Sequence, residues 1–123
     1  MPVMNNSYSE LSLAQQPLVD LDQWASLHRE LGSEMLLGFV AEFFAETAEL
    51  WLNKPLDLQT MDQSAFRSLA HRTAGVAGTI GFVKLRHVFL CMEYNPVLSD
   101  TQRYWEPMRA IVDQTKLWVQ LQH

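Results

Sequence analysis

The hydrophobic positions of this chain recur every three to four residues, which is typical of amphipathic helices. A short helix is predicted to begin after Asp20 and to end at Gly32. Its apolar face is made of Leu21, Trp24, Ala25, His28 and Leu31. The next helix is predicted to begin at Ser33 and to end before Pro55, because proline cannot continue a helix interior.

This second helix carries the widest apolar surface. One stripe consists of Leu36, Phe39, Val40, Phe43, Thr47 and Leu50. A second stripe beside it consists of Leu37, Phe44 and Trp51. Together they cover an arc of about 200°, which is too wide for contact with one neighbour. The second stripe is therefore expected to meet another helix of the chain or to serve as a docking patch for a partner.

Two further helices follow the connection over residues 56–61. The first is predicted from an N-cap at Asp62 to about Thr79. Its core-facing residues are Phe66, Leu69, Ala70, Thr73, Ala77 and Ile80. The next helix begins almost at once and is stopped by Asn95-Pro96. Its inner face consists of Phe82, Leu85, Val88, Phe89 and Met92.

The last helix is predicted from a cap at Asp100, with Pro107 in its second turn either kinking the helix or delaying its start. Its apolar positions are Tyr104, Met108, Ile111, Thr115, Trp118 and Leu121. No strand-like alternation of useful length occurs. The predicted fold is therefore all-α, an antiparallel up-down four-helix bundle with a short additional N-terminal helix. Residues 1–17 are expected to be a flexible lead-in or a strap over the bundle, and residues 18–123 to form the bundle domain.

Composition narrows the class of protein. The 123 residues, 48% of them hydrophobic, suffice for one core, so a single domain is expected. A net charge of −5 without any run of Lys or Arg longer than a pair argues against nucleic acid or an anionic membrane as partner. Cys91 is the only cysteine, and neither a signal peptide nor a membrane span is indicated, which favours the cytoplasm. The chain begins with Met1 and carries no kinase or receiver segment, which favours a free-standing protein.

Candidate chemistry is concentrated around His71. On a helical wheel this residue lies about 140° from Phe66, off the core arc, and so should face solvent. Its neighbours on the same face are Arg67, Gly75 and Gly78. Glycine inside a helix costs about 1 kcal/mol relative to alanine, and two of them here would leave the imidazole open to a large reactant, such as the active site of another protein. The competing interpretation is an ordinary surface histidine beside glycines that permit close helix packing.

The run His71-Arg72-Thr73-Ala74-Gly75, followed by Gly81 ten residues after the histidine, resembles the H-x-L-K-G…G signature of histidine phosphotransfer (HPt) domains. The resemblance extends over about residues 20–95. It implies a phosphorelay intermediate in a two-component system, with a phosphoryl group carried on Nε2 of His71. The implied partners are response-regulator receiver domains or a hybrid sensor kinase. The chain is expected to bind them as a monomer. The Mg²⁺ is then expected on the receiver, and the chain is expected to have no cofactor of its own. Since no ATP-site motif occurs, no kinase activity is expected.

The chain departs from the signature at two positions. Ala74 replaces the usual lysine and Thr73 the usual leucine, so one positive charge near the phosphoryl oxygens is missing. Three other cations are candidates for stabilising these oxygens, namely Arg67, Arg72 and Lys84.

Glu93 stands where the family often has Gln or Glu, twenty-two residues beyond the histidine. A carboxylate at this position could accept a hydrogen bond from Nδ1–H and so orient the imidazole of His71. The competing interpretation is a surface ion pair between Glu93 and Arg86.

Two other functions remain open. An HPt-like bundle without the lysine could bind a receiver or a kinase without accepting phosphate. A metal- or haem-binding bundle could use His71, His87 and a methionine, although the facing Glu and Glu-x-x-His constellations of such sites are missing. His28 and His87 are otherwise expected to be surface or boundary residues, and Trp24 with His28 offers a second possible docking patch.

Overall fold

The computed structural model describes residues 8–53, 62–94 and 103–122, and within these ranges the chain is helical without any strand. The helices are α1 (Glu10–Ala14), α2 (Leu21–Leu31), α3 (Ser33–Thr47), its π-helical continuation η2 (Ala48–Leu52), α4 (Gln63–Ile80), α5 (Val83–Tyr94) and α7 (Trp105–Gln122). The all-α prediction is thus confirmed for the described residues. The expected connection over residues 56–61, the stop at Asn95-Pro96 and the cap at Asp100 lie outside them.

The helix ends follow local chemistry. The Asp20 carboxylate accepts a hydrogen bond from the Gln23 backbone N–H at 3.1 Å, and so caps α2. Gly32 ends α2 with φ 80°, a backbone conformation that side chains disfavour, and its N–H donates to the His28 carbonyl oxygen. Asp62 caps α4 by accepting from the Ser64 N–H. All three boundaries lie where the sequence predicts them.

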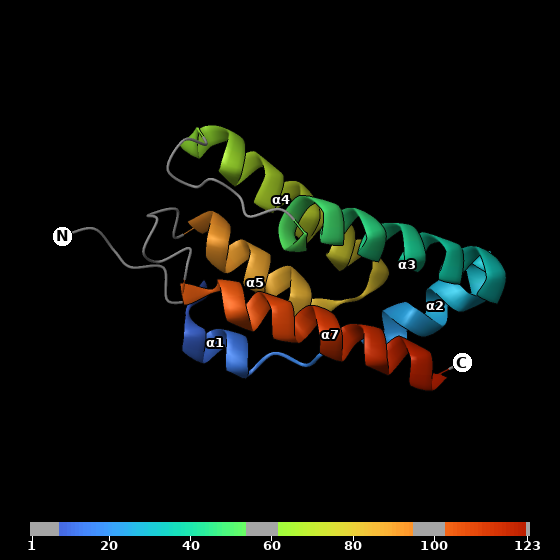
Figure 1. The fold of residues 1–123 in the computed structure, drawn as a ribbon. Helices are drawn as coiled ribbons and strands as arrows, with labels where there is room; N and C mark the ends of the chain where they lie inside the picture. The colour runs from blue at the N-terminus through green and yellow to red at the C-terminus, as the bar shows by residue number, and fades with distance from the viewer. Residues whose placement is uncertain (1–7, 54–61, 95–102, 123) are drawn as a thin grey trace.

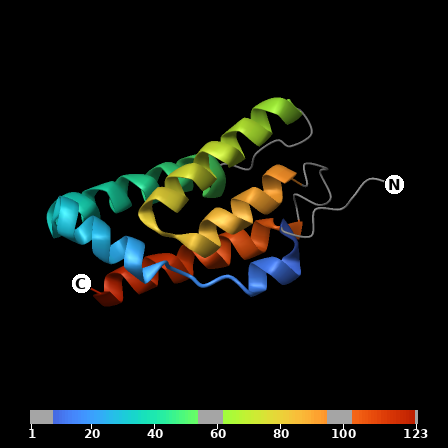
Figure 2. The same cartoon turned by 180° about the vertical axis from the view of Figure 1, so that it is seen from behind.

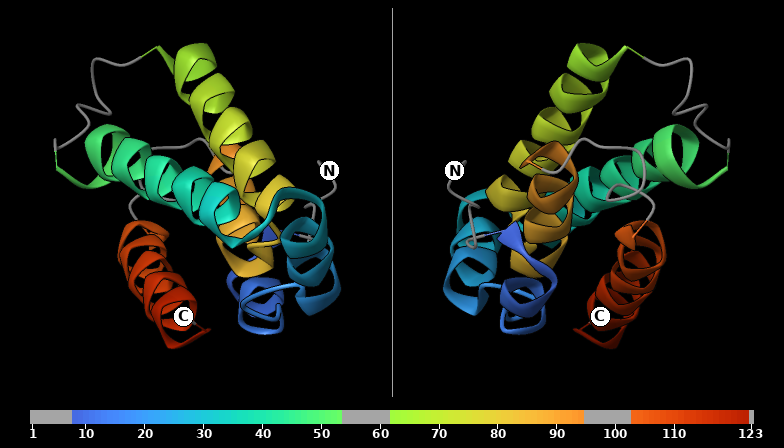
Figure 3. Two further views of the ribbon diagram at one scale, coloured as in Figure 1. Left: turned by 90° about the vertical axis from the view of Figure 1, so that its right-hand side faces the viewer. Right: turned by 90° about the vertical axis from the view of Figure 1, so that its left-hand side faces the viewer.

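The long helices α3, α4, α5 and α7 alternate in direction along the chain, as Figures 1 and 2 show. Helix α5 lies between α4 and α7 and makes its most extensive contact with α4, while α2 packs on α3 and α4. Figure 3 shows the N-terminal half of α4 leaning away from α7. This arrangement is compatible with an up-down four-helix bundle to which α1 and α2 are added. None of the described helices combines the length and apolar character needed to cross a membrane.

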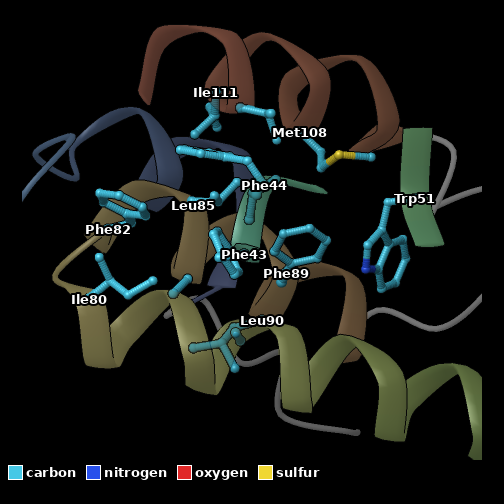
Figure 4. Close-up of a cluster of buried hydrophobic side chains, with 14 of the residues drawn as sticks. Phe43, Phe44, Trp51, Ile80, Phe82, Leu85, Phe89, Leu90, Met108 and Ile111 are labelled. Atoms are coloured by element: carbon cyan, nitrogen blue, oxygen red, sulfur yellow. The ribbon is translucent and has the colours of Figure 1, made fainter. Parts of the chain in front are cut away.

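The core gathers around α5 (Figure 4). Every inner residue predicted for this helix is buried, and so are several of its remaining positions, including Leu90 and Cys91. Side chains from α3, η2 and α7 meet α5, as illustrated by Trp51, which is fully buried and lies 4.9 Å from the Phe89 ring centroid. The six consecutive residues His87–Met92 are all buried, so this part of α5 is enclosed on every side, as a central position requires.

Several expectations about individual apolar residues are wrong. Phe39 and Leu121, placed on the apolar faces of their helices, are 51% and 74% exposed. Of the two possibilities for the second stripe of the 33–52 helix, contact with other helices is what the structure has, because Phe44 and Trp51 are buried in the core. The alternative patch at Trp24 is excluded for the same reason, because its ring is buried and contacts Phe82 and Trp118.

The described part of the N-terminal segment contains the helix α1. This helix packs on α5, with Leu13 buried. The Ser12 hydroxyl lies 2.9 Å from Nε2 of His87. His87, expected at the surface or its boundary, is therefore buried, because α1 covers that side of α5.

Helix α7 begins at Trp105, two residues before Pro107. Pro107 thus occupies the first turn, where a backbone N–H has no partner within the helix, so the missing donor costs nothing. The helix thus begins later than a cap at Asp100 would give, which agrees with a delayed start.

Candidate functional site

His71 and Glu93 face each other across the contact between α4 and α5. Nδ1 of His71 lies 3.0 Å from Oε1 and 3.2 Å from Oε2 of Glu93. The turn between the two helices produces this pairing. Gly81 adopts φ 95° there, and its N–H donates to the carbonyl oxygens of Ala77 and Gly78. In such a hairpin, residues about equally far from the turn lie opposite each other.

The two partners differ sharply in exposure. The His71 side chain is 72% exposed, whereas the Glu93 side chain is only 12% exposed. Because an ionised carboxylate can only accept, the hydrogen bond places a proton on Nδ1 of the imidazole. In the neutral ring, Nε2 then carries the free lone pair, and no described residue forms a hydrogen bond with it. The site therefore offers a nucleophilic nitrogen to solvent.

The competing pairing of Glu93 with Arg86 is not what the structure has. Among the described residues, the carboxylate of Glu93 is hydrogen-bonded to His71. The Arg86 side chain instead crosses α4 at Gly78, where an added Cβ would lie 2.8 Å from Arg86 Cδ. Sequence reasoning missed this contact.

The three glycines of the motif have different surroundings. Gly75 has open space where a Cβ would stand. Gly78 is covered by Arg86, so it does not leave the histidine's face open as expected. Gly81 forms the turn, and its carbonyl oxygen accepts from the Asp20 N–H at 2.8 Å. Only Gly75 thus provides free access beside His71.

The three candidate cations lie in different places on the molecule. Arg67 lines the same concave surface as His71. Arg72 lines a groove between α3 and α4 together with Glu46. Lys84 lies nine residues before Glu93, about 13 Å away along the axis of α5. The structure therefore brings only Arg67 to the histidine.

The position of the missing lysine is occupied by Ala74, which is 1% exposed. Thr73 is also structural: its hydroxyl accepts from the buried Trp51 indole N–H at 3.1 Å and donates to the Leu69 carbonyl oxygen. Both departures from the signature therefore lie in the packed interior, between α4 and its neighbours.

The concave surface beside His71 has a volume of about 560 Å³ and is open to solvent. Its lining consists of Gln63, Ser64, Arg67, Ser68, His71 and Glu93. Sequence reasoning missed Ser64 and Ser68, although their spacing of seven and three residues before His71 was a usable signal, because such residues share one helical face.

This chain matches no family model, no curated protein and no solved structure.

Other reactive groups lie apart from His71. Within the described ranges, no group of three or more His, Cys, Asp or Glu side chains is placed to hold a metal ion. His87 is engaged by α1 through Ser12. Burial raises the pKa of the Cys91 thiol to about 12, so this thiol stays protonated at neutral pH and is a poor nucleophile.

Proposed function

We propose that this chain is a histidine phosphotransfer protein, which accepts a phosphoryl group on His71 from a receiver aspartate and passes it to another. The observation that carries the proposal is the exposed imidazole of His71 with its Nδ1 held by the carboxylate of Glu93. The all-helical arrangement supports it too, since it is compatible with the antiparallel four-helix bundle of HPt domains. The proposal includes a monomer in the cytoplasm, where receiver domains and hybrid sensor kinases signal.

In the transfer, the Nε2 lone pair of His71 attacks phosphorus in line with the aspartyl oxygen. The Nε2–P bond forms, the P–O bond breaks, and its electron pair leaves on the aspartate carboxylate. The imidazole, still protonated at Nδ1, becomes a cation. Glu93 stabilises that cation through its negative charge at hydrogen-bond distance. The same steps in reverse deliver the phosphoryl group to the next receiver.

The chain needs no nucleotide for this role. The receiver supplies the Mg²⁺ and the acidic pocket, and this chain supplies a nucleophile of fixed orientation on a rigid helix. Gly75 leaves room for the receiver beside the imidazole.

The test uses receiver domains phosphorylated with acetyl phosphate in the presence of Mg²⁺. We expect the wild-type chain to gain acid-labile, alkali-stable phosphate from at least one receiver encoded in its own genome. His71→Gln should gain none. His28→Gln is the matched control, because it removes an imidazole from α2 and should transfer like the wild type.

If no receiver transfers phosphate to the wild-type chain, the carrier proposal is wrong. If a receiver then still binds the wild type and His71→Gln equally well, the chain is an interaction module, which is the function that the missing lysine favours.

A further inference from the structure

Three side chains that line the concave surface beside His71 carry hydrogen-bond donors, namely Ser64, Arg67 and Ser68. The side chains of Ser64, Arg67 and Ser68 are exposed and form no hydrogen bond or ion pair with other described residues. They stand seven, four and three residues before His71, and thus share its face of α4. Two hydroxyl groups and a guanidinium collected at one surface make an environment for an anion.

The direction of the imidazole matters here. Side chains on a helix tilt toward its N-terminus, so the His71 ring covers the turn that contains Arg67 and Ser68. These residues lie about 6 Å and 4.5 Å from His71 along the helix axis. Glu93 also lines the concave surface, but its carboxylate engages Nδ1, so a group attached to His71 is bonded to the other ring nitrogen, Nε2.

On the C-terminal side of His71, no cation of α4 lines the concave surface. Ala74 is buried, and Gly75 has no side chain. Arg72 lines the groove toward α3, and Arg86 is placed over Gly78, seven residues beyond the histidine. Positive charge and hydroxyl donors next to the imidazole are therefore found only on its N-terminal side, within the described residues.

We propose that Arg67 and Ser68, with Ser64 one turn further, bind the oxygens of a phosphoryl group carried on Nε2 of His71. This inference rests on the proposed function. The oxyanion is held on the side of the histidine toward the N-terminus of α4, opposite to the side where the HPt signature has its lysine. Arg67 supplies the positive charge, and the two serine hydroxyls donate hydrogen bonds.

Such contacts lengthen the lifetime of the phosphohistidine. The phosphoryl oxygens carry more negative charge in the phosphohistidine than in the loose transition state for its hydrolysis. Donors around these oxygens therefore stabilise the phosphorylated form more than the transition state, and the phosphoryl group is lost more slowly.

The experiment measures this lifetime without a receiver. Phosphoramidate transfers its phosphoryl group to the imidazole with release of ammonia, and the loss of protein-bound phosphate is then followed by ³¹P NMR after the donor is removed. We expect Arg67→Gln to shorten the half-life about three- to tenfold, and Ser68→Ala about two- to fivefold. Arg72→Gln removes the same charge from the other side of α4 and should keep the wild-type half-life. In urea, where the site is absent, all variants should decay at one rate.

Equal half-lives of the wild type, Arg67→Gln and Ser68→Ala in the folded state would overturn the inference. So would a failure of phosphoramidate to phosphorylate His71, because the site requires an accessible Nε2. The proposed function can fail separately: variant-dependent half-lives without transfer from any receiver would leave the oxygen site standing and refute the relay. If a receiver transfers phosphate but the wild type and the variants have equal half-lives, the relay stands and the oxygen site is refuted.

Discussion

Replacement of Glu93 tests the pair on which the site depends. Glu93→Gln keeps an oxygen that can accept from Nδ1–H but removes the negative charge. Glu93→Ala removes both. We expect phosphorylation of His71 to be fastest in the wild type, slower in Glu93→Gln and slowest in Glu93→Ala. Glu93→Gln loses only the negative charge, whereas Glu93→Ala also loses the hydrogen bond that fixes the Nδ1–H tautomer.

The size of the charge effect follows from the geometry. Two unit charges 3.0 Å apart, the Nδ1–Oε1 distance, interact by about 1.4 kcal/mol in a medium as polar as water. That dielectric suits a histidine whose side chain is 72% exposed. Since about 1.4 kcal/mol is a factor of ten, Glu93→Gln should react about tenfold more slowly. Partial burial of Glu93 strengthens this interaction, whereas a loose transition state develops only part of the charge on the imidazole, so tenfold is an order of magnitude. Glu93→Ala should be slower still.

The assay is single-turnover uptake of phosphate from phosphoramidate at pH 8, where a free imidazole is neutral. The matched control is Glu46→Gln, which removes an exposed carboxylate from α3. In addition, ¹⁵N NMR of the His71 ring should show the Nδ1–H tautomer in the wild type and a shift toward Nε2–H in Glu93→Ala. Rates for both Glu93 variants within twofold of Glu46→Gln would refute the role assigned to the carboxylate.

Three further outcomes concern the fold. Gly81→Ala should lower the free energy of unfolding by about 1–3 kcal/mol in urea denaturation, because φ is 95° and an added Cβ would lie 3.2 Å from Gln23 Cγ; an unchanged midpoint would contradict this. Gly78→Ala should raise stability by at most about 1 kcal/mol, since helix propensity improves while the flexible Arg86 side chain moves aside; a loss above that size would show that the contact is rigid. The raised pKa of Cys91, about 12 against 9.0 for a free thiol, means that between these pH values only the unfolded chain loses the thiol proton. The free energy of unfolding should therefore fall more steeply above pH 9 in the wild type than in Cys91→Ala, and the native thiol should resist Ellman's reagent at pH 8 until urea is added.

The sequence could predict features that one residue decides locally. Gly32 and Asp62 set helix boundaries through their own backbone or side-chain chemistry, and both lie where expected. The approach of Glu93 to His71 follows from the hairpin at Gly81, because residues about equally far from a tight turn meet. The same rule pairs position 78 with position 86, so the contact of Arg86 with α4 could also have been found.

Features that depend on packing between distant segments could not be predicted. Helix α1 has only five residues and a single buried one, Leu13, so it leaves no periodic signal. The burial of His87 depends on α1 and was missed with it. The wheel placed Phe39 on the same apolar stripe as Leu36, but the position of the neighbouring helices leaves its ring exposed. Likewise, the burial of Ala74 follows from the close approach of α4 and α5.

The central position of α5 has a consequence for the dynamics of the chain. A helix enclosed by its neighbours exchanges its amide hydrogens mainly through global unfolding, whereas short peripheral helices such as α1 open in local fluctuations. Glu93 lies in the last turn of this enclosed helix. A protein that docks on α4 can therefore reorient surface side chains at little cost, but it cannot displace the backbone that carries the carboxylate without disrupting the core. The imidazole of His71 would keep its tautomer through repeated encounters with different partners.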